Sequence, residues 1–84
     1  MEIEAQIQRY VAQNLLFSDN GFEHSNDTSF LEEGIIDSLG VLGLVAFVET
    51  AFEVVVDGHE ITPDNFDSVN QLADYIRGKL AGSG

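Results

Sequence analysis

Cysteine is absent from this chain of 84 residues, which also has only one proline and three basic side chains. The lack of cysteine excludes disulfide bonds, thiolate metal sites and cysteine nucleophiles, and is compatible with a reducing cytosol. No apolar run is long enough to span a membrane. The first residues also lack the basic start of a signal peptide. The sequence therefore predicts a cytoplasmic protein without a membrane partner.

The scarcity of basic side chains leaves a strongly acidic chain. Fifteen acidic residues face three basic ones, and the formal net charge is −12. All three basic residues lie near the ends, so residues 10–76 contain no lysine or arginine. Such a surface repels nucleic acid and excludes it as a partner. It attracts basic protein surfaces, but acidity also serves solubility alone, and charge by itself leaves both interpretations open.

The spacing of apolar residues predicts an all-α fold. Amphipathic patterns indicate main helices over about residues 2–16, 38–53 and 68–80. Pro63 begins a short helical turn, in which Phe66 is expected to point inward. We therefore expect a small four-helix bundle, made of three main helices and one short helix.

Residues 17–37 are expected to form a long first loop, because turn-forming residues fill it. Its apolar residues are expected to pin it to the core: Phe17, Phe22, Phe30, Leu31, Ile35 and Ile36. The three valines of residues 54–56 are expected to form an apolar connection packed on the core. Residues 1–80 form a single domain in this prediction, and residues 81–84 a flexible tail or a remnant of cloning.

The patterns that metal binding and hydrolysis require are missing. The loop from Asp19 lacks the ligand spacing of an EF-hand. His24 and His59 lie too far apart in sequence to suggest a zinc site. No nucleophile elbow is present for a serine hydrolase. We therefore expect no metal site and no serine hydrolase.

Two serines, Ser38 and Ser68, each follow an aspartate and begin an expected helix. Ser68 is read as an N-cap, because Gln71 completes a capping box with it. Val41 cannot do the same for Ser38. A helix N-terminus also suits a phosphate, since its free N–H groups and the helix dipole stabilise negative charge. The residues alone leave Ser38 open between a capping role and a functional one.

The segment Phe30–Leu39, FLEEGIIDSL, resembles the modification motif of acyl carrier proteins. The similarity extends over nearly the whole chain, including the first helix, the long loop and residues 65–69. Asp-Ser-Leu alone is a weak signal. At the start of the second helix, in a chain of this size and charge, it is specific.

The resemblance implies that Ser38 carries a covalent 4′-phosphopantetheine arm, which a phosphopantetheinyl transferase attaches from coenzyme A. Asp37 and Leu39 flank the serine and belong to the same site. The arm's thiol would hold the cargo as a thioester, so the cofactor supplies the thiol that the chain lacks. The protein would be a carrier and not an enzyme, and we expect a monomer.

The resemblance also implies a docking surface on the second helix. Its expected members are Leu39, Leu42, Ala46, Glu49 and Glu53. Partners would be an acyl- or aminoacyl-loading ligase or transferase and downstream enzymes with basic or apolar docking patches. Fatty-acid carriers commonly have acids at positions that here hold Gly40, Gly43, Thr50 and Ala51. This departure indicates a specialised stand-alone carrier whose docking relies more on apolar contact.

Three functions follow as hypotheses. The first is a carrier of acyl intermediates in a lipid or secondary-metabolite pathway, such as polyketide synthesis. The second is an aminoacyl or peptidyl carrier. The third, from another class, is an acidic helical interaction module without a prosthetic group. Fatty-acid carriers shelter their cargo between helices. Phe47, Phe52 and Phe66 could fill that space here and leave a small cargo exposed, but we favour the simpler interpretation that they are core residues, since aromatic side chains dominate small cores.

Overall fold

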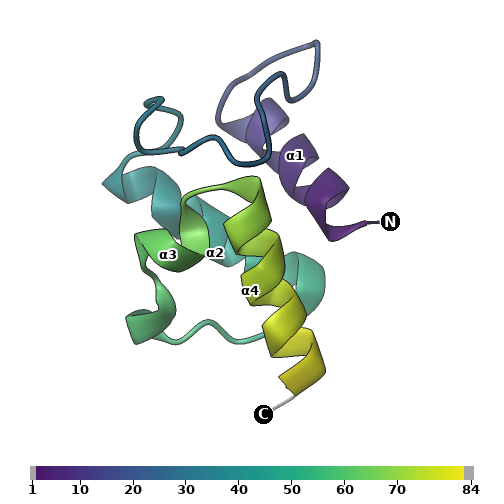
Figure 1. Ribbon diagram of the computed structural model, residues 1–84, viewed down its shortest axis with the longest axis vertical. Helices are drawn as coiled ribbons and strands as arrows, with labels where there is room; N and C mark the ends of the chain where they lie inside the picture. The colour runs from purple at the N-terminus through teal and green to yellow at the C-terminus, as the bar shows by residue number, and fades with distance from the viewer. Residues whose placement is uncertain (1, 83–84) are drawn as a thin grey trace.

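A computed structural model describes residues 2–82, except for the side chain of Ser38. Within that range the chain forms helices and no strand. The elements, shown in Figure 1, are α1 (Ile3–Asn14), α2 (Ser38–Phe52), the 3₁₀ turn η1 (Gly58–Glu60), α3 (Pro63–Phe66) and α4 (Val69–Gly82). The predicted all-α bundle of three main helices and one short helix is confirmed.

The helix ends differ slightly from their predicted positions. Helix α2 stops at Phe52, because Glu53 adopts the left-handed conformation with φ 55° and ψ 46°. Helix α4 begins after Ser68, whose Oγ accepts a hydrogen bond from the Gln71 amide at 3.1 Å. It continues to Gly82, so residues 81–82 of the expected flexible tail are helical. Residues 83–84 lie outside the described part of the chain.

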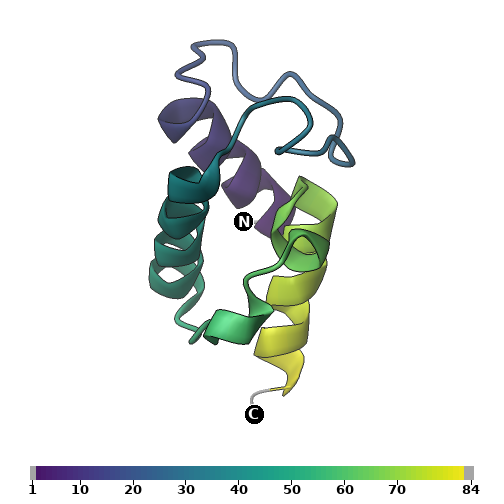
Figure 2. The ribbon, with the colours of Figure 1, turned by 90° about the vertical axis from the view of Figure 1, so that its left-hand side faces the viewer.

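Two helix contacts and one long loop arrange the bundle. Helix α4 packs against both α1 and α3. In Figure 2, α2 and α4 form opposite sides of the molecule, and both begin at the same end. The loop between α1 and α2 arches over that end. The beginning of α2, where Ser38 lies, therefore shares one end of the molecule with the loop and with the start of α4.

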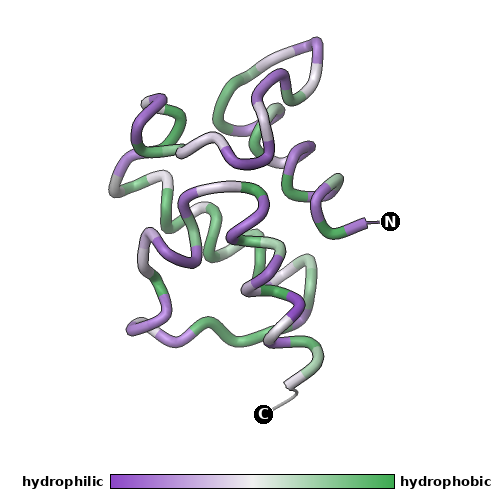
Figure 3. The backbone as a smooth tube through the Cα atoms, viewed as in Figure 1, coloured by the Kyte–Doolittle hydropathy of each residue, from purple (hydrophilic) through white to green (hydrophobic). Residues whose placement is uncertain are grey.

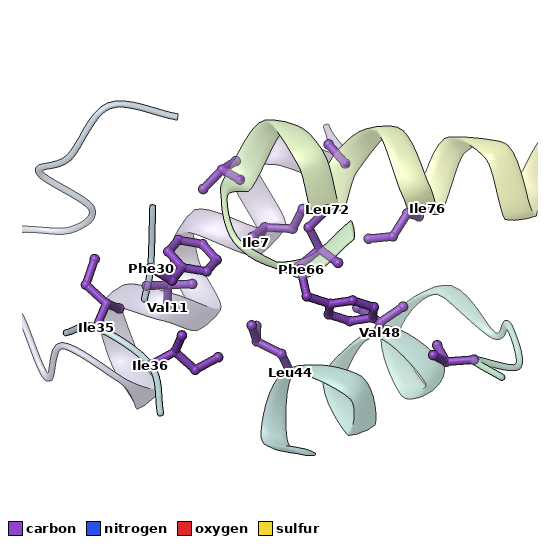
Figure 4. Packing of buried hydrophobic residues seen from close by; sticks show 13 residues of the cluster. Ile7, Val11, Phe30, Ile35, Ile36, Leu44, Val48, Phe66, Leu72 and Ile76 are labelled. Atoms are coloured by element: carbon purple, nitrogen blue, oxygen red, sulfur yellow. The ribbon is translucent and has the colours of Figure 1, made fainter. Parts of the chain in front are cut away.

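The core joins one face of each main helix to Phe30 from the long loop and Phe66 from α3. Its central residues, most of them labelled in Figure 4, are Ile7, Val11, Phe30, Leu44, Val48, Phe66, Val69, Leu72 and Ile76. Phe30 is completely buried although it belongs to the loop. Full burial of a side chain of this size contributes about 1.5–3 kcal/mol. Figure 3 shows apolar stretches in the connections as well as in the helices.

The expectation that every apolar loop residue is buried is wrong at two positions. Phe30, Ile35 and Ile36 are buried as predicted. Phe17 is 79% exposed and Leu31 is 48% exposed. Phe17 also has a φ of 52°, in the left-handed region, just after α1 ends. Periodicity cannot predict such a residue, because its orientation follows from how the helix terminates.

The valines of residues 54–56 are also only partly as predicted. Val56 is buried and Val54 packs against the core, but Val55 is 71% exposed. The segment is extended, so successive side chains point in opposite directions. Three consecutive apolar residues therefore cannot all face the core.

Glu60, at the end of η1, ties this connection to α4. Its Oε1 accepts hydrogen bonds from Lys79 Nζ at 3.0 Å, Tyr75 Oη at 3.0 Å and the Asp57 amide at 3.1 Å. These donors, led by Lys79, lower the pKa of the Glu60 carboxyl to about 2. Burial, followed by the hydrogen bond to Glu60, raises the pKa of the Tyr75 phenol.

The Glu60 contacts predict a specific acid sensitivity. The folded-state pKa lies below the ordinary value of 4.5, so the carboxylate stabilises the fold fully above pH 4.5 and loses this effect as the pH falls toward 2. Glu60→Gln should lower the free energy of unfolding at pH 7 and flatten its decline in that acidic window. Urea unfolding at a series of pH values measures this, with exposed Glu23→Gln as the control. Parallel curves for wild type and Glu60→Gln would contradict it.

Candidate functional site

Asp37 caps the first turn of α2. Asp37 is the N-cap in an extended conformation, and its Oδ1 accepts a hydrogen bond from the Gly40 amide at 2.8 Å. Ser38 is the first residue of the helix; its side chain is outside the described part of the structure. The interpretation of Ser38 as an N-cap is therefore wrong, and Ser38 differs from Ser68, which does cap a helix.

Gly40 allows the loop to approach this first turn closely. A Cβ at residue 40 would lie 2.7 Å from Ile36 Cγ1 and 3.4 Å from Asp37 Oδ1. Ile36 is buried, so it cannot easily move away. Gly43 has a similar role on another side of α2, where a Cβ would lie 2.9 Å from Tyr10 Oη. These glycines therefore serve contacts with the rest of the protein, at a cost in helix propensity.

The segment just before Ser38 is a tight turn built around Phe30. The Phe30 carbonyl accepts hydrogen bonds from the amides of Ile35, at 2.8 Å, and Ile36, at 3.3 Å. Gly34 closes the turn with a φ of 69°, a conformation that favours glycine. This turn brings Ile36 into the core and delivers the chain to Asp37.

Asp67 fastens this turn to the corner between α3 and α4. Its Oδ2 accepts a hydrogen bond from Ser29 Oγ at 2.6 Å, and its Oδ1 accepts one from the Leu31 amide at 2.9 Å. Its backbone carbonyl accepts a third, from the Phe30 amide at 2.7 Å. Local sequence patterns do not predict these bonds, because the partners lie 36 to 38 residues apart.

The predicted docking residues fall into two groups. Leu39 and Leu42 are 77% and 61% exposed, and Ala46 is also exposed. They form an apolar surface that starts beside Ser38, and we call it the apolar ridge. Glu53 is exposed at the end of α2.

Glu49, by contrast, makes a contact within the chain. Its Oε2 accepts a hydrogen bond from the Val56 amide at 3.0 Å, which holds the connection after α2. It is also the only charged residue between Ser38 and Phe52. Helix α2 therefore presents little charge to a partner along its length, and the exposed carboxylate of Glu53 lies just after its C-terminal end.

A small apolar cavity of about 80 Å³ opens near the beginning of α2. The loop, α2 and the segment from η1 to α4 supply its lining: Leu31, Ile36, Val41, Ile61, Thr62, Pro63, Phe66 and Asp67. Phe66 is one of the side chains that line this space. Phe47 instead stacks on Tyr10 with ring centres 4.5 Å apart and meets Phe52 at 5.9 Å.

One group of potential metal ligands was not predicted. Ligand atoms of Asp57, His59 and Glu60 lie within 4.8 Å of one another. A Glu60 oxygen in this group already receives the Lys79 ammonium at 3.0 Å, and exposed acidic groups often cluster without a metal. We assign no metal to it. No helix in residues 2–82 is long and apolar enough to cross a membrane.

The chain matches the model of a known protein family. The model of the family described as "phosphopantetheine attachment site" matches residues 5–76. The matched region includes all of α2, the turn before it and most of α4.

The site predicts opposite effects for two glycine-to-alanine substitutions in helices. Gly78→Ala in α4 meets no atom within 4 Å and should raise the free energy of unfolding by up to about 1 kcal/mol, through helix propensity alone. Gly40→Ala gains the same propensity but pushes against Ile36, and should lower stability by about 1–3 kcal/mol. Chemical denaturation of both variants measures the difference. Equal stabilisation by both would show that Gly40 makes no close contact.

Proposed function

The chain belongs to the phosphopantetheine attachment site family, and from that premise we propose that Ser38 is the residue that carries the arm. Members of this family bind covalently attached 4′-phosphopantetheine, so this chain is a carrier protein. The observation that supports Ser38 is its place at the first position of α2, with the capping role taken by Asp37. When bound, the arm supplies the thiol that holds a cargo as a thioester.

The local backbone suits a phosphodiester at this position. The first N–H groups of an α-helix have no partner within the helix, and the helix dipole places partial positive charge there. The Asp37 Oδ1 accepts from the Gly40 amide. Asp37 thus shapes the helix start, and Leu39 provides the apolar surface next to the arm. A phosphopantetheinyl transferase that uses coenzyme A is the first partner of this site.

We propose that the cargo is a small acyl intermediate of a lipid or secondary-metabolite pathway. The cavity near the start of α2 is lined mainly by apolar side chains, which suits an acyl chain. Its volume of about 80 Å³ equals roughly two or three times the volume share of a water molecule. An aminoacyl or peptidyl cargo remains the alternative, with its ammonium group in solvent.

Partner enzymes would dock on the apolar ridge of Leu39, Leu42 and Ala46, with Glu53 contributing charge at its far end. The exposure of the two leucines supports this role, since exposed apolar patches beside a site mark interaction surfaces. In this proposal the protein is a monomeric cytoplasmic substrate of its partners and not a catalyst. The hypothesis of an interaction module without an arm leaves the family match unexplained.

Intact mass spectrometry tests the attachment site. After incubation with coenzyme A and a phosphopantetheinyl transferase of broad specificity, the wild type should gain one phosphopantetheine. Ser38→Ala should gain none. Ser68→Ala should still gain one, because Ser68 also follows an aspartate but is only 4% exposed and caps α4. An adduct retained in Ser38→Ala would overturn the assignment.

A substitution on the apolar ridge tests docking. Leu42→Glu should reduce kcat/KM with the cognate loading enzyme by about tenfold or more, because a contact worth roughly 1.5–3 kcal/mol is replaced by a charge. The matched control is Val55→Glu, a similar change at a residue that is 71% exposed outside α2. Unchanged rates for Leu42→Glu, or equal losses for both variants, would contradict docking on this ridge.

Thermal unfolding of loaded forms tests the cargo. A butanoyl group should raise Tm relative to the unloaded arm, since each buried methylene contributes about 0.8 kcal/mol. An octanoyl group should give little further rise, because the cavity is full. An alanyl group should give none, since its ammonium avoids an apolar site. No rise in Tm with butanoyl would contradict a sheltered acyl cargo and would favour the aminoacyl alternative, whose cargo lies in solvent.

A further inference from the structure

We propose that Asp67 is a positioning residue for the modification of Ser38, because it holds the turn that a transferase must meet next to that serine. This inference rests on the proposed function of Ser38. Asp67 lies far from Ser38 in sequence and does not touch the arm in this proposal. It acts through residues 29–34, which we call the Phe30 turn.

Two hydrogen bonds attach the Phe30 turn to the Asp67 carboxylate. One carboxylate binds both ends of the segment from Ser29 to Leu31, through the Ser29 hydroxyl at 2.6 Å and the Leu31 amide at 2.9 Å. Hydrogen bonds to an ionised acceptor are stronger than those between neutral groups. Ser29 Oγ in turn accepts a hydrogen bond from the Glu32 amide at 3.1 Å. The carboxylate therefore fixes the orientation of the hydroxyl that organises the turn.

Contacts of Phe30, Ile36 and Gly40 connect the Phe30 turn to the start of α2. The Phe30 carbonyl accepts from the amides of Ile35 and Ile36, and buried Ile36 packs at the closest approach to Gly40. Gly40 donates to Asp37, the N-cap. Each link is a direct contact, so the turn, the cap and the first residue of α2 form one continuous unit.

The earlier part of the loop, at residues 26–27, is held by other hydrogen bonds. Asn26 has its own ties, accepting from Gln8 Nε2 at 2.6 Å and from the Asn70 amide at 3.0 Å. Asp27 accepts from Asn70 Nδ2 at 2.6 Å. These bonds hold residues 26–27 to α1 and α4 without Asp67. Loss of the Asp67 carboxylate should therefore loosen the Phe30 turn locally.

Ser68 provides a matched control for general stability. Ser68 is adjacent to Asp67 and lies at the start of α4. Its Oγ accepts a hydrogen bond from the Gln71 amide, which belongs to α4 itself. Both Asp67→Ala and Ser68→Ala remove hydrogen bonds at one corner of the fold. Only Asp67→Ala removes a bond to the segment that precedes Ser38.

Kinetics of modification distinguish positioning from stability. If the ordered turn is the conformation that the transferase binds, loosening it multiplies the apparent affinity by the fraction that remains ordered, so the affinity falls. Asp67→Ala should therefore raise the KM for the carrier by about tenfold, equivalent to about 1.4 kcal/mol, with kcat unchanged. Ser68→Ala should lower Tm and leave KM as in the wild type. Ser29→Ala should raise KM in the same direction as Asp67→Ala.

Asp67→Asn supplies the conservative rescue. An asparagine side chain can accept a hydrogen bond from the Leu31 amide and donate one to Ser29 Oγ. The KM of Asp67→Asn should therefore lie close to the wild-type value. This variant and Ser29→Ala also keep the test decisive if Asp67→Ala does not fold. Amide hydrogen exchange provides a readout that needs no transferase: exchange at Leu31 and Glu32 should accelerate in Asp67→Ala and not in Ser68→Ala.

The outcomes separate the two proposals. No adduct on the wild type, or an adduct that survives Ser38→Ala, overturns the proposed function and with it this inference. A normal adduct on the wild type, with the same KM for Asp67→Ala and Ser68→Ala, overturns the inference alone. A KM for Asp67→Asn as high as that for Asp67→Ala overturns positioning through these hydrogen bonds.

Discussion

The geometry around Ser38 depends on the contact between the Asp67 carboxylate and the Phe30 turn. A loop as long as residues 15–37 is costly to order, at about 1–2 kcal/mol of backbone entropy for each fixed residue. The burial of Phe30 offsets part of this cost, and Asp67 fixes the direction in which the turn faces. The Asp67 carboxylate and the buried Phe30 ring together order the loop, and the ordered loop fixes the position of the start of α2.

Helix α2 combines contacts and exposure in an unusual way. Its glycines bring it close to Ile36 and Tyr10, and its single charged residue, Glu49, is engaged by the Val56 amide. What it offers to a partner is therefore mainly the apolar ridge. An acidic protein with an almost uncharged recognition helix would attract basic partners from a distance through its overall field and bind them through apolar contact. This combination suits a specialised carrier.

Much of the fold could be predicted from the sequence, because helices reveal themselves by local spacing. The main helices, the inward Phe66 and the start of α2 at Ser38 all follow from residues a few positions apart. The details of the site could not be predicted in this way. The hydrogen bonds of the Asp67 carboxylate join residues that lie 36 to 38 positions apart in sequence. The exposure of Phe17 follows from its own left-handed conformation just after α1. Such features depend on the assembled structure.

Peptide mapping of the protein isolated from its own cell tests the central claim most directly. Cleavage after glutamate can release residues 34–49, whose only serine is Ser38, separately from residues 61–84, which contain Ser68. If Ser38 carries the arm, phosphopantetheine, with any cargo, is found on the fragment of residues 34–49. An unmodified fragment 34–49, or phosphopantetheine on residues 61–84, would contradict it.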